Sequence, residues 1–239
     1  MSRKRHPAFL HALLPLLVLA AAPAWAQTGT PAPTLVGYHP PSDSRPLADD
    51  TAPRPMLAAM RAVGETVPAT WIKRTSRELG QSMIPQLFGK LQRKETIALL
   101  TTEFQEGYVQ VFVELPGFMQ MTVIEMATPE SAASFLLVNM DTLVQQLNAT
   151  DQVEDAQVEM IHEGEIDLEN LDQAFEQQYR LVLGDLTTNF LTLFGQAGRH
   201  MISITFTQME IDAPQGRQVL QDLVAALAGG DDGTPPAGN

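Results

Sequence analysis

The clearest alternation of apolar and polar positions lies in residues 176–228, where it predicts three antiparallel strands followed by one helix. Gly184 and Asp185 join the first two strands, and a leading glycine suits a type II′ hairpin turn. The second strand, around 190–194, is apolar on both faces, which indicates a central place in a sheet. Residues 195–198 are then expected to turn the chain.

The third predicted strand has one apolar face and one polar face. Ile202, Ile204 and Phe206 share one face, and Ser and Thr residues occupy the other. A helix follows whose apolar stripe can cover that face. The stripe consists of Val219, Leu220, Leu223, Val224 and Leu227.

The ends of this helix carry recognisable signals. Asp212 with Gln215 three residues later resembles a capping box, which predicts the first turn. The pair Gly229-Gly230 predicts the C-terminus.

The N-terminal half predicts a similar plan. Strands are expected over 97–102, 108–115 and 119–126, with a type II turn at Leu115-Pro116-Gly117-Phe118. Thr128-Pro129 then opens a helix. Its buried stripe is Ala132, Leu136, Met140, Leu143 and Leu147.

Segments 108–147 and 187–228 therefore share the order strand, turn, strand, helix. Identical residues between them are too few to establish an internal duplication, so the question stays open at this level.

Residues 56–93 are predicted to be mainly helical. Met56 to Val63 forms a short helix ending at Gly64, and 72–93 form a second helix that Pro85 interrupts. Six basic residues mark this second segment: Lys73, Arg74, Arg77, Lys90, Arg93 and Lys94. They indicate either a surface for anionic lipid headgroups or a solvated face, and we favour the solvated face.

Residues 151–176 hold ten acidic side chains and one or two short strands. Glu165, Asp167 and Glu169 would share one face of an extended segment and could offer oxygen ligands to Ca²⁺. No EF-hand loop is present, and like charges are also typical of a solvated edge strand, which we favour.

The first 26 residues have the pattern of a secretory signal peptide. Arg3, Lys4 and Arg5 precede an apolar run from Leu13 to Ala22, and Ala24-Trp25-Ala26 supplies a cleavage site. The apolar run is too short to span a bilayer. We therefore expect an exported mature chain, periplasmic or extracellular, without a transmembrane segment.

Four parts are predicted along the chain: a signal peptide (1–26), a disordered Pro-rich linker (27–55), one α+β domain (56–228) and a disordered tail (229–239). The linker is either a plain flexible N-terminus or a tether to a membrane or partner. An exported chain with 0 Cys has no disulfides, so an ordinary core must stabilise the domain.

Charge and motifs exclude several function classes. The formal net charge is −13, and residues 95–239 carry most of the acids, so nucleic-acid binding is not expected. No serine-hydrolase elbow, metallopeptidase motif, P-loop or dinucleotide-binding motif is present. We expect no enzyme and no cofactor, although a hydrolase using acidic residues stays as an alternative.

A copper site is a further alternative. Met119 and Met121 share one strand face, and His200-Met201 begins the corresponding later strand. Thioether and imidazole groups suit Cu(I). Met residues occur in every predicted element, however, which favours their use as core filler.

The order of elements, with its Pro68-to-Trp71 entry, antiparallel strands and terminal helix, resembles the PsbP-like α/β sandwich. The resemblance covers about 68–228 and carries over no functional residue. It implies an antiparallel sheet with packed helices and a binding or accessory role, with an unknown envelope protein or small ligand as partner.

Overall fold

The computed structural model describes residues 45–46, 54–67, 72–88, 92–114, 117–150, 156–184, 186–208 and 212–231. The predicted signal peptide, most of the predicted linker, the entry at 68–71 and the chain beyond Asp231 lie outside these residues.

The described strands form one antiparallel sheet in the order β1-β2-β3-β4-β8-β7-β6-β5. The strands are β1 (Arg45–Pro46), β2 (Ile72–Leu79), β3 (Phe104–Glu114), β4 (Gly117–Met126), β5 (Ala156–Glu165), β6 (Gln173–Leu183), β7 (Leu186–Ala197) and β8 (His200–Gln208). The helices are α2 (Pro55–Thr66), α3 (Met83–Phe88), α4 (Lys94–Glu103), α5 (Pro129–Thr150) and α6 (Ala213–Asp231). The predicted α+β class, an antiparallel sheet with helices packed on it, is confirmed.

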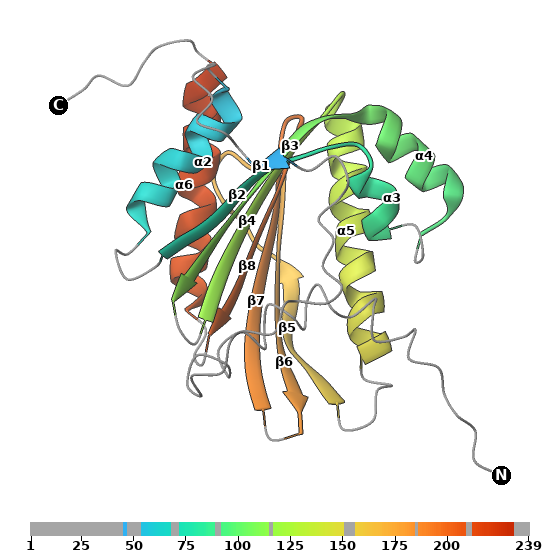
Figure 1. Ribbon diagram of the computed structural model, residues 1–239, viewed down its shortest axis with the longest axis vertical. Helices are drawn as coiled ribbons and strands as arrows, with labels where there is room; N and C mark the ends of the chain where they lie inside the picture. The colour runs from blue at the N-terminus through green and yellow to red at the C-terminus, as the bar shows by residue number, and fades with distance from the viewer. Residues whose placement is uncertain are drawn as a thin grey trace.

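Helices cover both faces of the sheet (Figure 1): α2 and α6 lie on one side, and α3, α4 and α5 on the other. Leu191 and Leu193 of β7 pack under α2 and α6, whereas Phe190 and Phe194 pack under α5. β7 pairs with β6 and β8. Its predicted central place is therefore confirmed, and burial on both faces explains why residues 190–194 carry apolar side chains on both faces.

The two strand-turn-strand-helix segments are not repeats of each other in space. β4 and β8 pair antiparallel near the centre, so a half-turn about an axis perpendicular to the sheet would exchange the β3–β4 and β7–β8 hairpins. That operation keeps each face of the sheet on its own side. The following helices, α5 and α6, lie on opposite faces, so they would not be exchanged.

Both long helices begin as the sequence predicts. The Ser131 N–H donates to Thr128 Oγ1 at 3.1 Å, and the Thr128 N–H donates to Ser131 Oγ at 3.1 Å. This is a capping box in which serine stands where glutamate is usual. The Gln215 N–H donates to Asp212 Oδ1 at 3.0 Å and starts α6.

The expectation of a helix over 72–93 is wrong for its first part, because residues 72–79 form β2. Leu79 and Met83 do lie in the same core, but one belongs to a strand and the other to α3. Pro85 lies in the first turn of α3, where a missing N–H costs nothing. The sequence pattern did not indicate this strand because its residues are mostly polar, as is common in a strand near the edge of a sheet.

The expected strand at 97–102 is also wrong, because these residues lie in α4. Ile97 and Leu100, three residues apart, are its buried positions. Two threonines lie in its last turns: Thr101 Oγ1 donates to the Ile97 carbonyl at 2.7 Å, and Thr102 Oγ1 donates to the Ala98 carbonyl at 2.9 Å. These bonds satisfy both hydroxyls within the helix.

Several glycines do not end elements where expected. β7 continues through Gly195 to Ala197, and the turn comes at Gly198, whose φ is 54°. α2 passes Gly64, whose missing side chain admits the Phe112 ring, and α6 passes Gly229. Glu114 pairs with Gly117, and Gly117 therefore begins β4 and does not occupy the centre of a turn.

Candidate functional site

The three copper-candidate methionines are divided between the two cores, and His200 belongs to neither. Met119 and Met121 are buried under α2 and α6, where they lie opposite Phe206 and Ile204 of β8. Met201 is buried in the core under α5. His200 begins β8, four positions before the partner of Met121, which is about 13 Å along a strand. The structure therefore does not bring the four side chains together.

The acidic loop after β5 has the alternation that the sequence predicts. Glu165, Asp167 and Glu169 are exposed, while Ile166 and Leu168 pack against the core under α2 and α6. Among the described residues, no group of three or more His, Asp or Glu side chains is arranged to hold a metal ion.

The basic residues of 73–94 do not form one helical face. Lys73, Arg74 and Arg77 belong to β2, and Arg93 and Lys94 begin α4. Lys90 lies outside the described residues.

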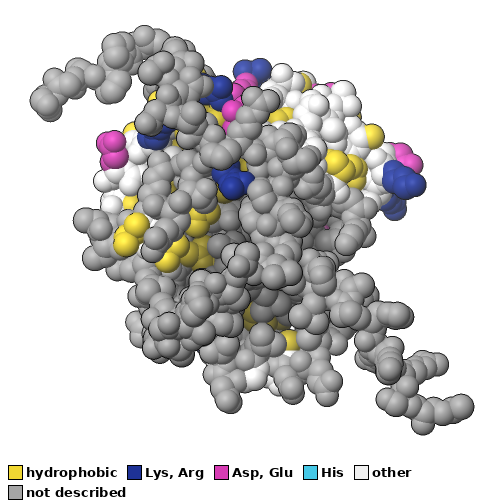
Figure 2. All heavy atoms as spheres, viewed as in Figure 1, with side chains coloured by type: hydrophobic (Ala, Val, Ile, Leu, Met, Phe, Trp, Pro, Cys, Tyr) yellow, Lys and Arg dark blue, Asp and Glu magenta, His cyan; other side chains and the backbone are white. Residues whose placement is uncertain are grey.

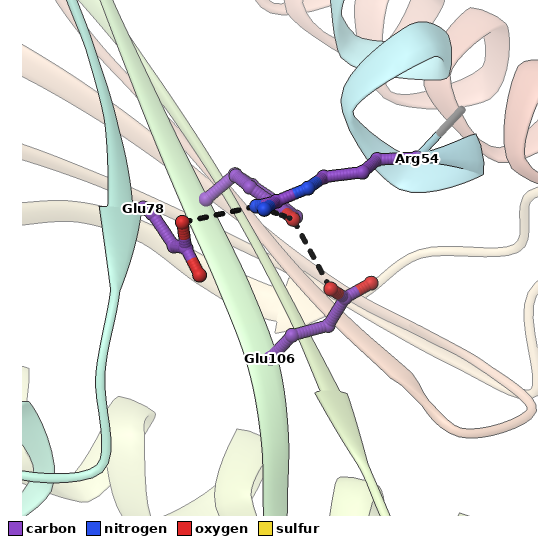
Figure 3. A network of polar contacts seen from close by, with 4 residues as sticks. Arg54, Glu78 and Glu106 are labelled. Carbon is purple, nitrogen blue, oxygen red and sulfur yellow. Dashed lines mark hydrogen bonds and ion pairs between the residues drawn. The ribbon is translucent and has the colours of Figure 1, made fainter. Parts of the chain in front are cut away.

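A polar network ties the start of α2 to the sheet (Figure 3). Arg54 Nη1 donates to Glu78 Oε2 at 2.9 Å and to the Tyr108 hydroxyl at 3.0 Å. The Tyr108 hydroxyl in turn donates to Glu106 Oε2 at 3.1 Å. Arg54 precedes α2, Glu78 is on β2, and the other two are on β3.

The contacts in this network shift the pKa values of two of its groups, Tyr108 and Arg54. Burial raises the pKa of Tyr108, which keeps the phenol protonated at neutral pH. The bonds to Glu78 and Tyr108 raise the pKa of Arg54 further. The network therefore holds the start of α2 against β2 and β3.

A second network surrounds the buried carboxylate of Glu176, at the end of the acidic region 151–176. Glu176 lies on β6, opposite Leu193 of β7, and its side chain is 0% exposed. Arg217 Nε of α6 donates to Oε2 at 2.6 Å, and Gln178 Nε2 donates to Oε1 at 2.6 Å. Both carboxylate oxygens are thus occupied.

The pKa of Glu176 follows from these contacts. Burial alone would raise it, but the hydrogen bonds from Arg217 and Gln178 outweigh burial and lower it. The carboxylate is therefore ionised at neutral pH and holds no proton to donate. A general acid needs the opposite shift.

Sequence reasoning overlooked both networks. One signal was available for the second: Glu176 occupies an inward position of its strand, where a carboxylate needs a cationic partner. Arg217 is the single Lys or Arg after residue 199. The pairing itself depends on how α6 crosses the sheet, which the sequence pattern does not show.

Gln110 of β3 contrasts with Glu176. It is buried under α2 beside Gly64, and neither its side-chain nitrogen nor its oxygen has a hydrogen-bond partner within the described part of the chain. Such a group carries an uncompensated desolvation cost.

No protein-family model matches the chain, and no curated protein matches its sequence. Among solved structures, the extracellular domain of PknH from Mycobacterium tuberculosis is similar, with 9% identity, a TM-score of 0.49 and coverage of 77% of this chain and 98% of that one. The Rv0999 ortholog from Mycobacterium smegmatis has 8% identity, a TM-score of 0.39 and coverage of 72% and 96%.

The solution structure of PsbP from the cyanobacterium Synechocystis sp. PCC 6803 is also similar, with 20% identity, a TM-score of 0.31 and coverage of 49% of this chain and 71% of that one. A PsbP structure is thus among the solved structures to which the chain is distantly similar, as the order of elements predicts. These likenesses concern the fold alone, and they transfer no function to this chain.

Proposed function

We propose that the chain is an exported, non-enzymatic domain that binds or assists another component of the cell envelope. The observation that carries this proposal is the state of Glu176. This carboxylate of the acidic region has the burial that an active site would use, and Arg217 and Gln178 occupy both of its oxygens. Its lowered pKa suits an ion pair that holds α6 on the sheet.

The export part of the proposal rests on the signal-peptide pattern of residues 1–26. None of the helices in the described part of the chain is long and apolar enough to cross a membrane.

The alternative is a hydrolase whose acids lie in 151–176. Such an enzyme needs two carboxylates of different pKa facing one substrate bond. Glu163 is not such a partner for Glu176, because its Oε1 accepts a hydrogen bond from Gln177 at 2.8 Å, and Gln177 is on the other face of β6. The copper alternative is disfavoured because Met119 and Met121 lie in one core, Met201 lies in the other, and His200 lies in neither.

Turnover measurements separate the two functions. The mature chain is incubated with chromogenic ester, phosphate, glycoside and peptide substrates, beside a Glu176→Gln variant whose circular dichroism is native. We expect the same background rate from both proteins. Turnover by the mature chain that the variant lacks would establish the hydrolase instead.

The proposed binding role can be tested at exposed apolar side chains of α4 and α5. Leu99 of α4 and Leu137 of α5 are 54% and 52% exposed, and these two helices contact each other. Figure 2 shows apolar side chains at the surface over α4 with charged side chains beside them. We expect an envelope protein with an apolar contact surface to be captured by the mature chain and not by a Leu99→Asp, Leu137→Asp variant. Equal capture by both would remove this surface from the proposal.

A further inference from the structure

α2 lies over three side chains of β3 that share one face of the sheet. At the start of the helix, Arg54 Nη1 donates to the Tyr108 hydroxyl at 3.0 Å (Figure 3). Near its end, a Cβ at Gly64 would lie 3.0 Å from Phe112 Cζ and 3.4 Å from Gln110 Oε1. Tyr108, Gln110 and Phe112 alternate along β3, so their side chains point to the same side. α2 therefore covers all three.

The middle one of these side chains disfavours the position that α2 occupies. Gln110 is 0% exposed, and neither Nε2 nor Oε1 has a hydrogen-bond partner among the described residues. An amide that leaves water and gains no partner raises the free energy of the state that buries it. If α2 moves away from β3, water reaches both atoms and this penalty is removed.

α2 is also a weak helix on its own. It has 12 residues, and its N-cap residue makes no side-chain capping bond within the described part of the chain. Glu65 lies in the last turn, where an acidic side chain opposes the helix dipole, and Gly64 lowers the helix propensity. Helices of this length are marginal in isolation, so α2 depends on its contacts with α6 and β3.

α6, the neighbouring helix on the same face of the sheet, is anchored more firmly. It has 19 residues, and Asp212 Oδ1 accepts a hydrogen bond from the Gln215 N–H at 3.0 Å at its start. Its Arg217 donates to the buried carboxylate of Glu176 on β6 at 2.6 Å. Regions of low local stability open without unfolding of the whole domain, and of these two helices α2 is the less stable one.

We propose that α2 is a movable strap, which opens from β3 and α6 while the sheet and α6 stay folded. In the closed state, Arg54 fastens the start of the strap through Glu78 and the Tyr108 hydroxyl. Opening presents the Gln110 amide, with a donor nitrogen and an acceptor oxygen, between Tyr108 and Phe112. The strap thus controls access to this surface of β3.

Hydrogen exchange of the mature chain, followed by mass spectrometry, tests the proposal first. Peptides that cover α2 are compared with peptides that cover α6. We expect the protected amides of α2 to exchange at least about tenfold faster than those of α6, because α2 opens without global unfolding. Equally slow exchange in the two helices would overturn the proposal.

A Gln110→Met variant tests whether the opening uncovers Gln110. The substitution removes the unpaired amide and so favours the closed state, and we expect exchange in α2 to slow by about tenfold. Unchanged exchange in α2 would show that Gln110 stays buried when the helix opens, and would contradict the proposal.

Gln120→Met is the matched control. Gln120 lies on β4 between Met119 and Met121, which pack under α2 and α6, so its side chain is on the other face of the sheet. Its surroundings do not change when α2 opens, and we expect exchange in α2 to be unaffected. The same slowing as in Gln110→Met would show that α2 exchanges only by global unfolding, which contradicts the strap.

An Arg54→Met variant loosens the start of the strap. We expect faster exchange in α2, and exchange as slow as in the wild type would contradict the role given to Arg54. Thermal melting confirms that each variant folds before exchange is measured. This inference stands apart from the proposed function, because a fixed α2 changes neither the turnover comparison nor the capture experiment.

Discussion

At the scale of single residues, the two buried polar side chains under the α2–α6 layer are in opposite situations. Glu176 has a donor on each oxygen, from Arg217 and Gln178. Gln110 has no partner for either polar atom among the described residues. A satisfied buried group stabilises the fold, whereas an unsatisfied one costs free energy. The two residues should therefore respond to substitution in opposite directions.

Replacing Gln110 by Met is expected to raise the free energy of unfolding by roughly 1–3 kcal/mol, because the substitution keeps the unbranched shape and removes the unpaired amide. Urea denaturation measures the change. Gln178→Met is the matched control, since that amide donates to Glu176 and its loss should destabilise. A less stable Gln110→Met protein would show that the Gln110 amide is satisfied in solution.

Replacing Arg217 by Met leaves the Glu176 carboxylate buried without its main partner. We expect a loss of roughly 1–3 kcal/mol at pH 7. In the wild type the pKa of Glu176 is lowered, so its contribution is present above the unfolded-state pKa of about 4.3 and disappears as the pH falls through the folded-state value.

In Arg217→Met the burial of Glu176 acts without that partner and raises the pKa, so protonation at low pH now stabilises the fold. The stability difference between the two proteins should therefore begin to shrink as the pH falls through the raised pKa of the variant, above the unfolded-state value of about 4.3, and should shrink further below that value as the wild type loses its contribution. Urea unfolding at pH 7, 5 and 3.5 measures it. A difference that is constant with pH would show that Arg217 acts through packing alone.

At the scale of elements, the predictions succeeded where a strand or helix lies in the middle of the molecule. Residues 190–194 of β7 are apolar on both faces because each face meets a core, and β8 alternates because Ile202, Ile204 and Phe206 face the core under α2 and α6. The stripe of α6 repeats at helical spacing because one side meets the sheet. β2 and α4 were misassigned. β2 is polar because it lies near an edge, and α4 is short and β-branched with only two buried positions.

α6 packs closely on β7, and Gly216 is the point of closest approach. A Cβ at Gly216 would lie 2.7 Å from Leu191 Cδ2 and 3.1 Å from Leu193 Cδ1. Alanine normally favours a helix over glycine by about 1 kcal/mol, but overpacking here should outweigh this, so we expect Gly216→Ala to destabilise by roughly 1–3 kcal/mol.

Gly229→Ala in the same helix is the control for Gly216→Ala. Its Cβ would meet no atom within 4 Å, so we expect equal or higher stability. Thermal melting compares the two variants. A stabilised Gly216→Ala protein would show that α6 stands further from the sheet than the structure has it.

At the scale of the whole molecule, the sequence predicted the class of fold better than it predicted which distant segments pair within the fold. The order of strands and helices from 104 onward was largely readable, because each hairpin is local and has a turn signal. The β4–β8 pairing that joins the two halves is a long-range contact with no local signal. The same limit hid the Glu176–Arg217 pair, whose partners are 41 residues apart and meet only when α6 crosses the sheet.

Export of the whole chain is expected to remove 26 residues. The Ala24-Trp25-Ala26 pattern places the cleavage before Gln27. Intact-mass spectrometry of the protein recovered from the periplasm or medium of an expressing cell checks this. A recovered chain that still begins at Met1 would contradict the predicted export signal.

The central claim is that the deeply buried carboxylate of Glu176 serves the fold and performs no catalysis. The most direct test is the free energy of unfolding of Glu176→Gln at pH 7 beside the wild type. Catalytic groups are commonly held at a cost in stability, so replacing one leaves a protein as stable or more stable.

A structural ion pair behaves in the opposite way, because the neutral amide of the variant cannot replace the charge that faces Arg217. We therefore expect a less stable Glu176→Gln protein with an unchanged fold. A variant at least as stable as the wild type would contradict it and would return Glu176 to the candidates for catalysis.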